Sequence, residues 1–216
     1  MKIDLLNAGK RFNRDWIFRH FNYTFSTGHS YAITGANGSG KSTLLQLIAS
    51  SSTISEGTIN YYDDSKIIDP NQFFNYISLA APYLELVEEM TLTEFFNFHH
   101  NLKGFYNQYT ASQIIEIISL EKAAKKEIRY FSSGMKQRVK LAQAIFSNVP
   151  VVLLDEPLTN LDTVGIHLYK KLIAENNNNR LFIISSNDPN EYDFCDQIIS
   201  MDSIKMGTDK LSPAGN

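Results

Sequence analysis

The chain has 216 residues and a net charge of −3, so it has no general electrostatic attraction for nucleic acid or an anionic membrane surface. Hydrophobic residues make up 43% and charged residues 20%, which is ordinary for a soluble globular protein, and the length allows one α/β domain. The single Cys195 excludes an internal disulfide and indicates a reducing compartment. No stretch reads as a signal peptide or reaches the ~18 apolar residues that span a bilayer, so we expect a cytosolic chain.

The first third mixes strands with one strand–loop–helix unit. Residues 16–25 are rich in aromatics and partly alternate, which predicts a strand closed by the turn at 26–28. Residues 29–35 then read as a buried strand, and residues 41–50 as the helix that follows a glycine-rich loop. A further strand is expected over 56–64. Antiparallel strands are therefore expected near the N-terminus.

The middle of the chain changes to helical spacing. Apolar residues recur at helical intervals over 91–102 and 111–120, and Thr91 or Thr93 can cap the first of these helices. We therefore interpret residues 82–130 as a small helical subdomain.

The last part alternates between helices and apolar strands. Helices are expected over 133–147 and 163–175, and strands over 151–155, 180–185 and 196–202. Continuous apolar strands separated by helices indicate a mostly parallel sheet that is covered on both faces.

Two short patterns need no functional role. The run Asn176–Asn179 is interpreted as a turn that tolerates left-handed backbone geometry. His99 and His100 point ~100° apart on a helix and lack a third ligand nearby, so we expect polar surface rather than a metal pair.

The stretch GANGSGKST fits the pattern G-x-x-x-x-G-K-[ST] between a strand and a helix. Its glycines let successive N–H groups converge on phosphates, and the helix N-terminus adds positive partial charge. Lys41 supplies a point charge for the β- and γ-phosphates, and the Ser42 hydroxyl can bind Mg²⁺. This predicts a site for a nucleoside triphosphate. The residues expected to line it are Gly35, Asn37, Gly38, Ser39, Gly40, Lys41, Ser42 and Thr43.

An acidic pair follows the apolar strand VVLL. Asp155 ends that strand at the carboxyl edge of the predicted sheet, where it can hold Mg²⁺ through water. Glu156 comes next and can polarise a water molecule that attacks the γ-phosphate, which makes it the candidate general base. The pair therefore favours ATP hydrolysis.

The stretch FSSGMKQRVKLAQAI resembles the signature motif of ATP-binding cassette (ABC) proteins, usually Leu-Ser-Gly-Gly-Gln. Here Phe131 replaces Leu, Ser132 is kept, Ser133 replaces the first Gly, Gly134 is kept and Met135 replaces Gln. Five motifs in the family's order cover nearly the whole chain: the glycine loop, the signature, the acidic strand, a Leu-Asp loop and the segment SSND. Such an ordered set is far more specific than any single motif.

The resemblance implies a single ABC-type ATP-binding domain over 1–216, with the P-loop NTPase fold, ATP and Mg²⁺. In the family the signature completes the ATP site of a second subunit, so it implies an ATP-dependent head-to-tail homodimer. Ser132, Ser133 and Gly134 would then contact the partner's ATP. Leu161 and Asp162 resemble the loop at the dimer seam, and Phe12 resembles the aromatic residue that stacks on adenine, with core packing as the alternative.

Two positions depart from the family. Where a Gln is usual, at the end of the strand before the helical subdomain, this chain has Ala81, or alternatively Ala80. Where a His is usual, it has Asn187, which can donate an N–H to a γ-phosphate oxygen but cannot carry a proton. We expect hydrolysis that is intact but slow, and an inactive dimerisation switch is the alternative.

The leading functional hypothesis is the ATPase subunit of an ABC transporter, peripheral on the cytoplasmic face of the inner membrane. Its helical subdomain would contact a separate membrane subunit, and no nucleic-acid partner is expected. A soluble ABC-type switch on a protein or nucleic-acid complex remains the alternative, while a small-molecule kinase leaves the signature unexplained. The apolar residues considered for the contact, or for the subdomain core, are Tyr83, Leu84, Leu86, Val87, Phe95, Phe96 and Phe98.

Overall fold

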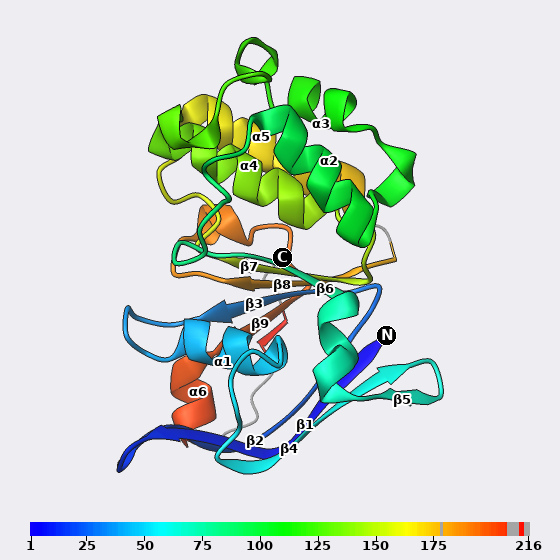
Figure 1. Ribbon diagram of the computed structural model, residues 1–216. Coiled ribbons are helices and arrows are strands. Elements are labelled where there is room, and N and C mark those ends of the chain that lie inside the picture. Colours follow the sequence, from blue (N-terminus) through cyan, green and yellow to red (C-terminus); the bar gives the residue numbers. More distant parts are fainter. Residues whose placement is uncertain (178, 207–211, 214–216) are drawn as a thin grey trace.

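The computed structural model describes residues 1–177, 179–206 and 212–213, which form two sheets and a helical layer (Figure 1). The strands are β1 (Lys2–Phe12), β2 (Asp15–Ser26), β3 (Ser30–Thr34), β4 (Glu56–Asp63), β5 (Lys66–Ile68), β6 (Ile77–Ala80), β7 (Val151–Asp155), β8 (Leu181–Ser185), β9 (Gln197–Ser200) and β10 (Ser212–Pro213). The helices are α1 (Lys41–Ile48), α2 (Leu92–Lys103), α3 (Ala111–Ile117), α4 (Ser133–Phe146), α5 (Thr163–Asn176) and α6 (Met201–Met206). The 3-10 turns are η1 (Pro70–Asn75), η2 (Tyr106–Gln108), η3 (Glu121–Ala123), η4 (Ile128–Tyr130) and η5 (Pro189–Glu191).

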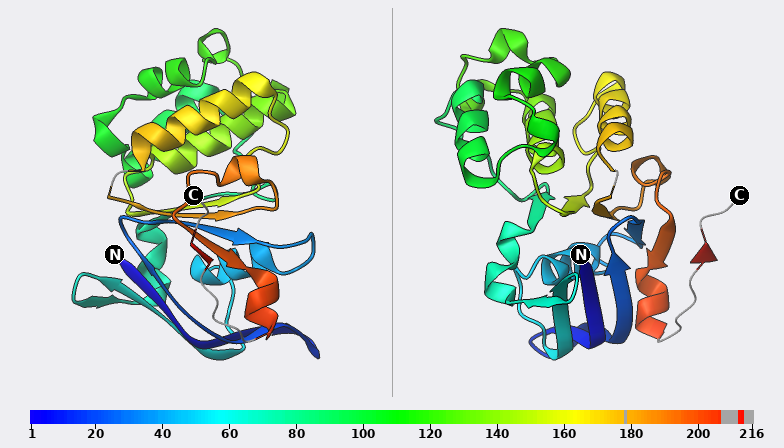
Figure 2. Two further views of the ribbon diagram at one scale, coloured as in Figure 1. Left: turned by 180° about the vertical axis from the view of Figure 1, so that it is seen from behind. Right: turned by 90° about the vertical axis from the view of Figure 1, so that its right-hand side faces the viewer.

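The larger sheet has the strand order β10-β9-β3-β8-β7-β6, and its neighbours from β9 to β6 are parallel. The smaller sheet is antiparallel, in the order β2-β1-β4-β5. Figure 2 shows α2 to α5 on one face of the larger sheet, with α1 and α6 between the two sheets. The predicted parallel sheet covered on both faces and the antiparallel N-terminal strands are therefore confirmed.

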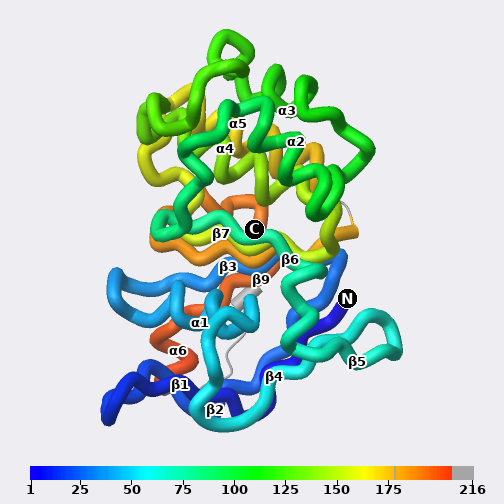
Figure 3. The backbone as a smooth tube through the Cα atoms, in the orientation of Figure 1, coloured from blue at the N-terminus to red at the C-terminus, as the bar shows by residue number. Residues whose placement is uncertain are grey.

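Two hydrophobic cores follow from this layering, which the tube in Figure 3 makes easy to trace. One lies between the larger sheet and helices α2–α5, and includes Phe96, Phe146 and Leu154. The other lies between the sheets around α1, and includes Phe18, Leu44 and Leu153. Because alternate residues of β7 point to opposite faces, neighbours such as Leu153 and Leu154 enter different cores. In the part of the chain that the structure describes, no helix is long and apolar enough to cross a bilayer.

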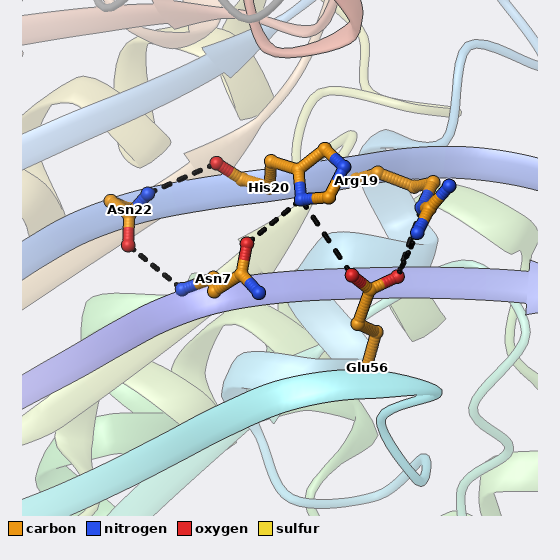
Figure 4. Close-up of polar contacts among 5 residues, drawn as sticks. All are labelled: Asn7, Arg19, His20, Asn22 and Glu56. Atoms are coloured by element: carbon orange, nitrogen blue, oxygen red, sulfur yellow. Dashed lines mark hydrogen bonds and ion pairs between the residues drawn. The ribbon is translucent and has the colours of Figure 1, made fainter.

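The 11-residue strand β1 was not expected from the sequence, because β-bulges interrupt its alternation. Figure 4 shows how polar side chains hold one of these irregularities. Asn22 Oδ1 accepts from the backbone N–H of Asn7, whose φ is +50°, and His20 Nδ1 lies 2.8 Å from Asn7 Oδ1. Arg19 donates twice to Glu56 Oε2, at 2.9 and 2.7 Å. Side chains from three strands therefore fix the local register.

The boundaries of several predicted elements shift by a few residues. Helix α3 ends at Ile117 rather than Leu120, where Ser119 takes a φ of +58°. Strand β9 stops at Ser200 because α6 begins at Met201. Of the predicted asparagine turn, Asn176 ends α5 and Asn179 has a φ of +54°, while residue 178 lies outside the described residues.

Residues 82–130 contain α2, α3 and short 3-10 turns, packed against α4. Thr91, rather than Thr93, caps α2: its hydroxyl accepts from the Glu94 N–H, and the Glu94 carboxylate accepts from the Thr91 N–H at 2.8 Å. This reciprocal pair explains why the helix begins at Leu92.

The expectation that His99 lies on a polar surface is wrong, because the side chain is only 6% exposed. Ser147 Oγ donates to the Gln143 carbonyl, so His99 Nε2–H donates to Ser147 Oγ at 2.7 Å and fixes a neutral tautomer. Burial lowers the pKa of His99 to about 4, and the charges of Lys103 and His100 act in the same direction. His99 therefore joins α2 to the C-terminal end of α4 as a neutral group.

This neutral burial predicts a pH dependence of stability. Between pH 6.5 and 4 the unfolded chain binds a proton at His99 that the folded chain does not, so stability falls as the pH decreases through this range. The loss reaches about 3 kcal/mol near pH 4, which urea unfolding at several pH values measures. His99→Gln should remove this component of the slope, whereas the exposed control His100→Gln should keep it. An unchanged slope in His99→Gln would contradict the assignment.

Candidate nucleotide-binding site

The residues singled out by the sequence meet at the carboxyl ends of the parallel strands. The glycine-rich loop joins β3 to α1 and forms the projection at the left of Figure 1. Asp155 ends β7 and pairs with Ser185 at the end of β8. The N–H of Ser186 donates to the Ile33 carbonyl of β3. Residues 186–191, called the switch segment below, therefore start beside the strand that leads into the loop. Parallel register thus brings segments far apart in sequence to one edge.

The loop needs glycine at the positions that the motif predicts. Gly35, Gly38 and Gly40 have φ values of +148°, +76° and +108°, which side-chain-bearing residues rarely adopt. A Cβ on Gly40 would lie 2.2 Å from Ile17 Cγ2 of β2, and one on Gly35 would lie 2.7 Å from Ser39 Oγ. The antiparallel sheet therefore packs directly against the phosphate-binding loop.

The positive groups of the loop point into it. The Lys41 ammonium is buried and donates to the carbonyls of Gly35, at 2.9 Å, and Ala36, at 3.3 Å. Helix α1 has no acidic residue in its first turn and no side-chain cap, so its N–H groups and dipole favour an anion. Half-buried Ser42 and Thr43 lie in this first turn.

The acidic end of β7 suits a hydrated cation. Asp155 is 3% exposed, and its Oδ1 has no hydrogen-bond partner among the described residues; the same holds for the buried hydroxyls of Ser39 and Ser185. A buried carboxylate oxygen without a partner costs free energy unless a cation or water satisfies it. No group of three His, Cys, Asp or Glu side chains that could hold a metal occurs in the described ranges. A cation here would therefore depend on Asp155, Ser42 and the oxygens of a bound phosphate.

Glu156 takes a strained backbone conformation, with φ of +45°. A non-glycine residue in this region costs on the order of 1–3 kcal/mol and persists only where its surroundings impose it. Its N–H donates to the Ser185 carbonyl at 2.9 Å, and its carbonyl accepts from Thr159 N at 3.2 Å. The side chain is half-buried and next to Asp155, as expected for the candidate base.

Asn187 lies near the start of the switch segment and is exposed. Its Nδ2 donates to Asn37 Oδ1 of the glycine-rich loop at 3.1 Å. The structure therefore places the residue that replaces the family's histidine against the phosphate-binding loop.

Phe12 ends β1, on the same hairpin whose strand β2 packs Ile17 over Gly40 of this loop. Its ring is 51% exposed, so it is not a core residue, and the Lys10 ammonium lies 5.0 Å from the ring centroid. Lys10 is buried and donates to Ser52 Oγ and the Thr53 carbonyl. An anchored cation on a largely exposed ring gives a platform on which a base can stack.

The signature residues lie at the N-terminus of α4. Ser132 is exposed and caps the helix by accepting from the Met135 N–H at 3.3 Å, and Ser133 is exposed beside it. A Cβ on Gly134 would lie 3.1 Å from the Asn160 carbonyl, so this glycine permits a close approach to the Leu-Asp loop. Across the described residues, no hydrogen bond joins 132–134 to 35–43.

The Leu-Asp loop leads into α5. Leu161 is half-buried, and Asp162 caps α5 by accepting from the Gly165 N–H at 2.8 Å. Arg138 of α4 also donates to Asp162, at 3.1 Å, and these contacts lower the pKa of Asp162. The loop is thus fixed to the signature helix.

The segment after β6 offers no polar side chain at the position where the family usually has Gln. Ala81 there is buried. Further along, Glu88 forms an ion pair with Lys136 of α4. Tyr83 was grouped only with the apolar surface, but its hydroxyl interacts with Gln46 of α1. Burial raises the pKa of Tyr83, and the nearby Asp155 charge adds to the effect. Sequence motifs carry no signal for such a contact.

Comparisons with known proteins agree with this geometry. A sequence profile of the family described as ABC transporter matches residues 18–159. An uncharacterised ABC transporter ATP-binding protein of Bacillus subtilis is 29% identical over 214 residues, covering 95% of each chain. ABC transporter I family member 1 of Arabidopsis thaliana is 32% identical over 176 residues, covering 79% of this chain and 75% of its own length.

Solved structures share the fold. An ATP-binding subunit of an ABC transporter superposes with a TM-score of 0.81 at 20% identity, covering 99% of this chain and 90% of that one. A dimeric ATP-binding cassette in a post-hydrolysis state, bound to ADP and phosphate, has a TM-score of 0.77 at 23% identity and covers 99% of both chains. With the family match, they show that this chain belongs to the ABC transporter family, as an ATP-binding and ATP-hydrolysing cassette subunit.

Proposed function

We propose that two copies of this chain close head to tail on two ATP molecules with Mg²⁺, hydrolyse them slowly, and drive a separate membrane subunit. The observation that supports this most directly is the buried Asp155 oxygen, which has no partner among the described residues, together with a loop whose three glycines have positive φ. That combination suits a triphosphate and its metal ion.

We assign the following roles in ATP binding and hydrolysis to residues of this chain. N–H groups of the loop and of α1 bind the phosphates, Lys41 neutralises them, and Ser42 and Asp155 would hold the ion. When bound, Mg²⁺ supplies further charge stabilisation to the phosphate oxygens. Glu156 orients and deprotonates the attacking water. Ala81 cannot assist it, and Asn187 donates a hydrogen bond without accepting a proton, so turnover is slow.

The dimer is supported by the exposure of the signature. Ser132 and Ser133 present the N-terminus of α4 to solvent, with N–H groups free to meet a second molecule's γ-phosphate. A dimeric cassette is found among solved proteins of this fold. In an isologous pair, each signature would complete the other copy's site.

The membrane contact is supported by apolar side chains that stay exposed around α2. Leu86, Phe95 and Phe96 are buried in the core, so they do not line a surface. Of the apolar residues considered for the contact, the exposed ones are Tyr83, Leu84, Val87 and Phe98, and Leu102 of α2 is exposed as well. We place the subunit on the cytoplasmic face of the inner membrane, held by this apolar surface.

The hydrolysis and the dimer share one test. Purified wild type should release phosphate from ATP, and Glu156→Gln should reduce kcat by about 10²- to 10⁴-fold because the general base is lost. The same variant with ATP and Mg²⁺ should elute as a dimer in size-exclusion chromatography, and adding Ser132→Arg should return it to a monomer. Equal phosphate release by wild type and Glu156→Gln would remove Glu156 as the base, and ATP-dependent dimerisation alone would indicate a switch without turnover.

The adenine platform predicts a base-specific loss of affinity. Phe12→Ala should weaken ATP binding by about 5- to 150-fold, since stacking on a base contributes about 1–3 kcal/mol, and leave inorganic triphosphate binding unchanged. Trp16→Ala is the matched control, because Trp16 is also on this hairpin and 37% exposed, but packs between Arg11 and Arg19. Equal losses in both variants, by calorimetry, would reject the platform.

The membrane contact predicts co-purification with a polytopic protein from native membranes. Val87→Asp should abolish that association by placing a charge in the apolar contact, while ATP binding persists. Ile67→Asp is the control on the edge strand β5 and should keep the partner, although Ile67 is more exposed (70%) than Val87 (42%). Recovery of wild type only from the soluble fraction, bound to protein or RNA, would contradict the transporter role.

A further inference from the structure

The turn that carries Glu156 is held by side chains from outside it. Glu156 is in left-handed backbone geometry, and the next two residues, Pro157 and Leu158, are buried. Backbone polar groups of a buried turn need partners, and this turn lies at the end of a sheet where no neighbouring strand supplies them all. Two side chains from other segments supply the further hydrogen-bond partners of this turn.

The first partner is Glu191, which lies in η5 of the switch segment and is 5% exposed. Its Oε1 accepts from the Leu158 N–H at 2.6 Å. The backbone of Glu191 is fixed in turn, because the buried Tyr169 hydroxyl donates to its carbonyl at 2.7 Å. Glu191 is thus a fixed acceptor for the N–H of Leu158, which lies two residues after the candidate base.

The second partner is Gln137, which lies on α4 four residues after its first residue, Ser133, and is 4% exposed. Its Nε2 donates to the Pro157 carbonyl at 2.8 Å. Gln137 and Glu191 therefore bind the same peptide group, the one between Pro157 and Leu158, Gln137 through its C=O and Glu191 through its N–H.

From this arrangement we infer that Gln137 and Glu191 are positioning residues for hydrolysis, because together they impose the backbone geometry that aims Glu156. Among the described residues, neither side chain forms a hydrogen bond with the glycine-rich loop, so their effect passes through Glu156. The inference rests on the proposed ATPase function. A carboxylate displaced by about 1 Å from its working position lowers a rate by about 10²-fold, while phosphate binding by a separate loop is left intact.

The two side chains also differ from ordinary packing residues in polarity. An apolar residue of equal volume at position 137 would leave the Pro157 carbonyl buried without a donor, and at position 191 would leave the Leu158 N–H without an acceptor. The turn can restore these bonds only by moving toward water. Such movement would release the strain at Glu156 and redirect its side chain.

The experiment compares Gln137→Met and Glu191→Met with wild type in steady-state ATP hydrolysis and in ATP binding. Each should lower kcat by about 10- to 100-fold with KM within about threefold, because the affinity for ATP resides in the separate loop. Glu191→Gln keeps an acceptor oxygen for Leu158 and should stay within about threefold of wild type. Gln143→Met is the matched control on the same helix, since Gln143 Nε2 contacts His99 and not the turn.

A second arm separates positioning from general destabilisation. In a Glu156→Gln background, measured in single turnover, Gln137→Met and Glu191→Met should change the residual rate by less than about threefold, because the residue that they aim is already gone. Equal losses in both backgrounds, a parallel loss in Gln143→Met, or a matching rise in KM would overturn the inference. If Gln137→Met fails to fold, the Glu191→Met and Glu191→Gln pair decides it alone.

The outcomes also separate this inference from the proposed function. Normal kcat in the folded Gln137 and Glu191 variants, with an active wild type, would overturn only the positioning role. Absence of phosphate release by wild type, under conditions where it binds ATP, would overturn both.

Discussion

The close approach of Ile17 to Gly40 is the contact on which the site's geometry depends. It is possible only because residue 40 has no side chain, and it fixes the antiparallel sheet directly against the phosphate-binding loop. The hairpin that carries Ile17 also carries Phe12, so the same contact that shapes the loop sets the place of the aromatic platform. The contact therefore joins the smaller antiparallel sheet to the loop that follows β3 of the larger sheet. The β-bulge network around Asn7 and Glu56 then keeps the hairpin in register.

We expect the substitutions at Ala81 and Asn187 to affect catalysis rather than binding. The positive groups of the loop, the unpartnered Asp155 oxygen and the strained Glu156 turn are all present, and none of them needs the missing glutamine or histidine. Asn187 instead donates to Asn37 Oδ1 of the loop, which uses one of the two N–H groups of its amide. Tyr83, which interacts with Gln46 and Asp155, lies two residues after Ala81. The general base and the charged and polar groups that bind the phosphates are therefore present. The glutamine and histidine that would orient water and transfer protons are replaced at these two positions.

The sequence predicted local features well and long-range contacts poorly, for physical reasons. Loop glycines, strand-end acids and the Thr91 cap depend on a few adjacent residues, so their patterns are readable. Strand β1 was missed because its bulges break the period of two, and His99 was misplaced because its partner Ser147 is 48 residues away. Gln137 and Glu191 looked ordinary in sequence for the same reason. Their partners Pro157 and Leu158 are known only once α4, β7 and η5 are packed together.

The position of Gln137 has a consequence for how two ATP molecules communicate. In a head-to-tail dimer, the N-terminus of α4 would contact the nucleotide held by the partner, while Glu156 would activate the water that attacks the nucleotide held by its own chain. Gln137 bonds the turn of Glu156 from the first two turns of that same helix, and Arg138 and Gly134 contact the loop that follows. A helix is stiff over this distance, so a shift of its N-terminus on the partner's phosphate would also move the Pro157–Leu158 peptide group that Gln137 holds. One rigid element would then link ligand contact at one site to base geometry at the other.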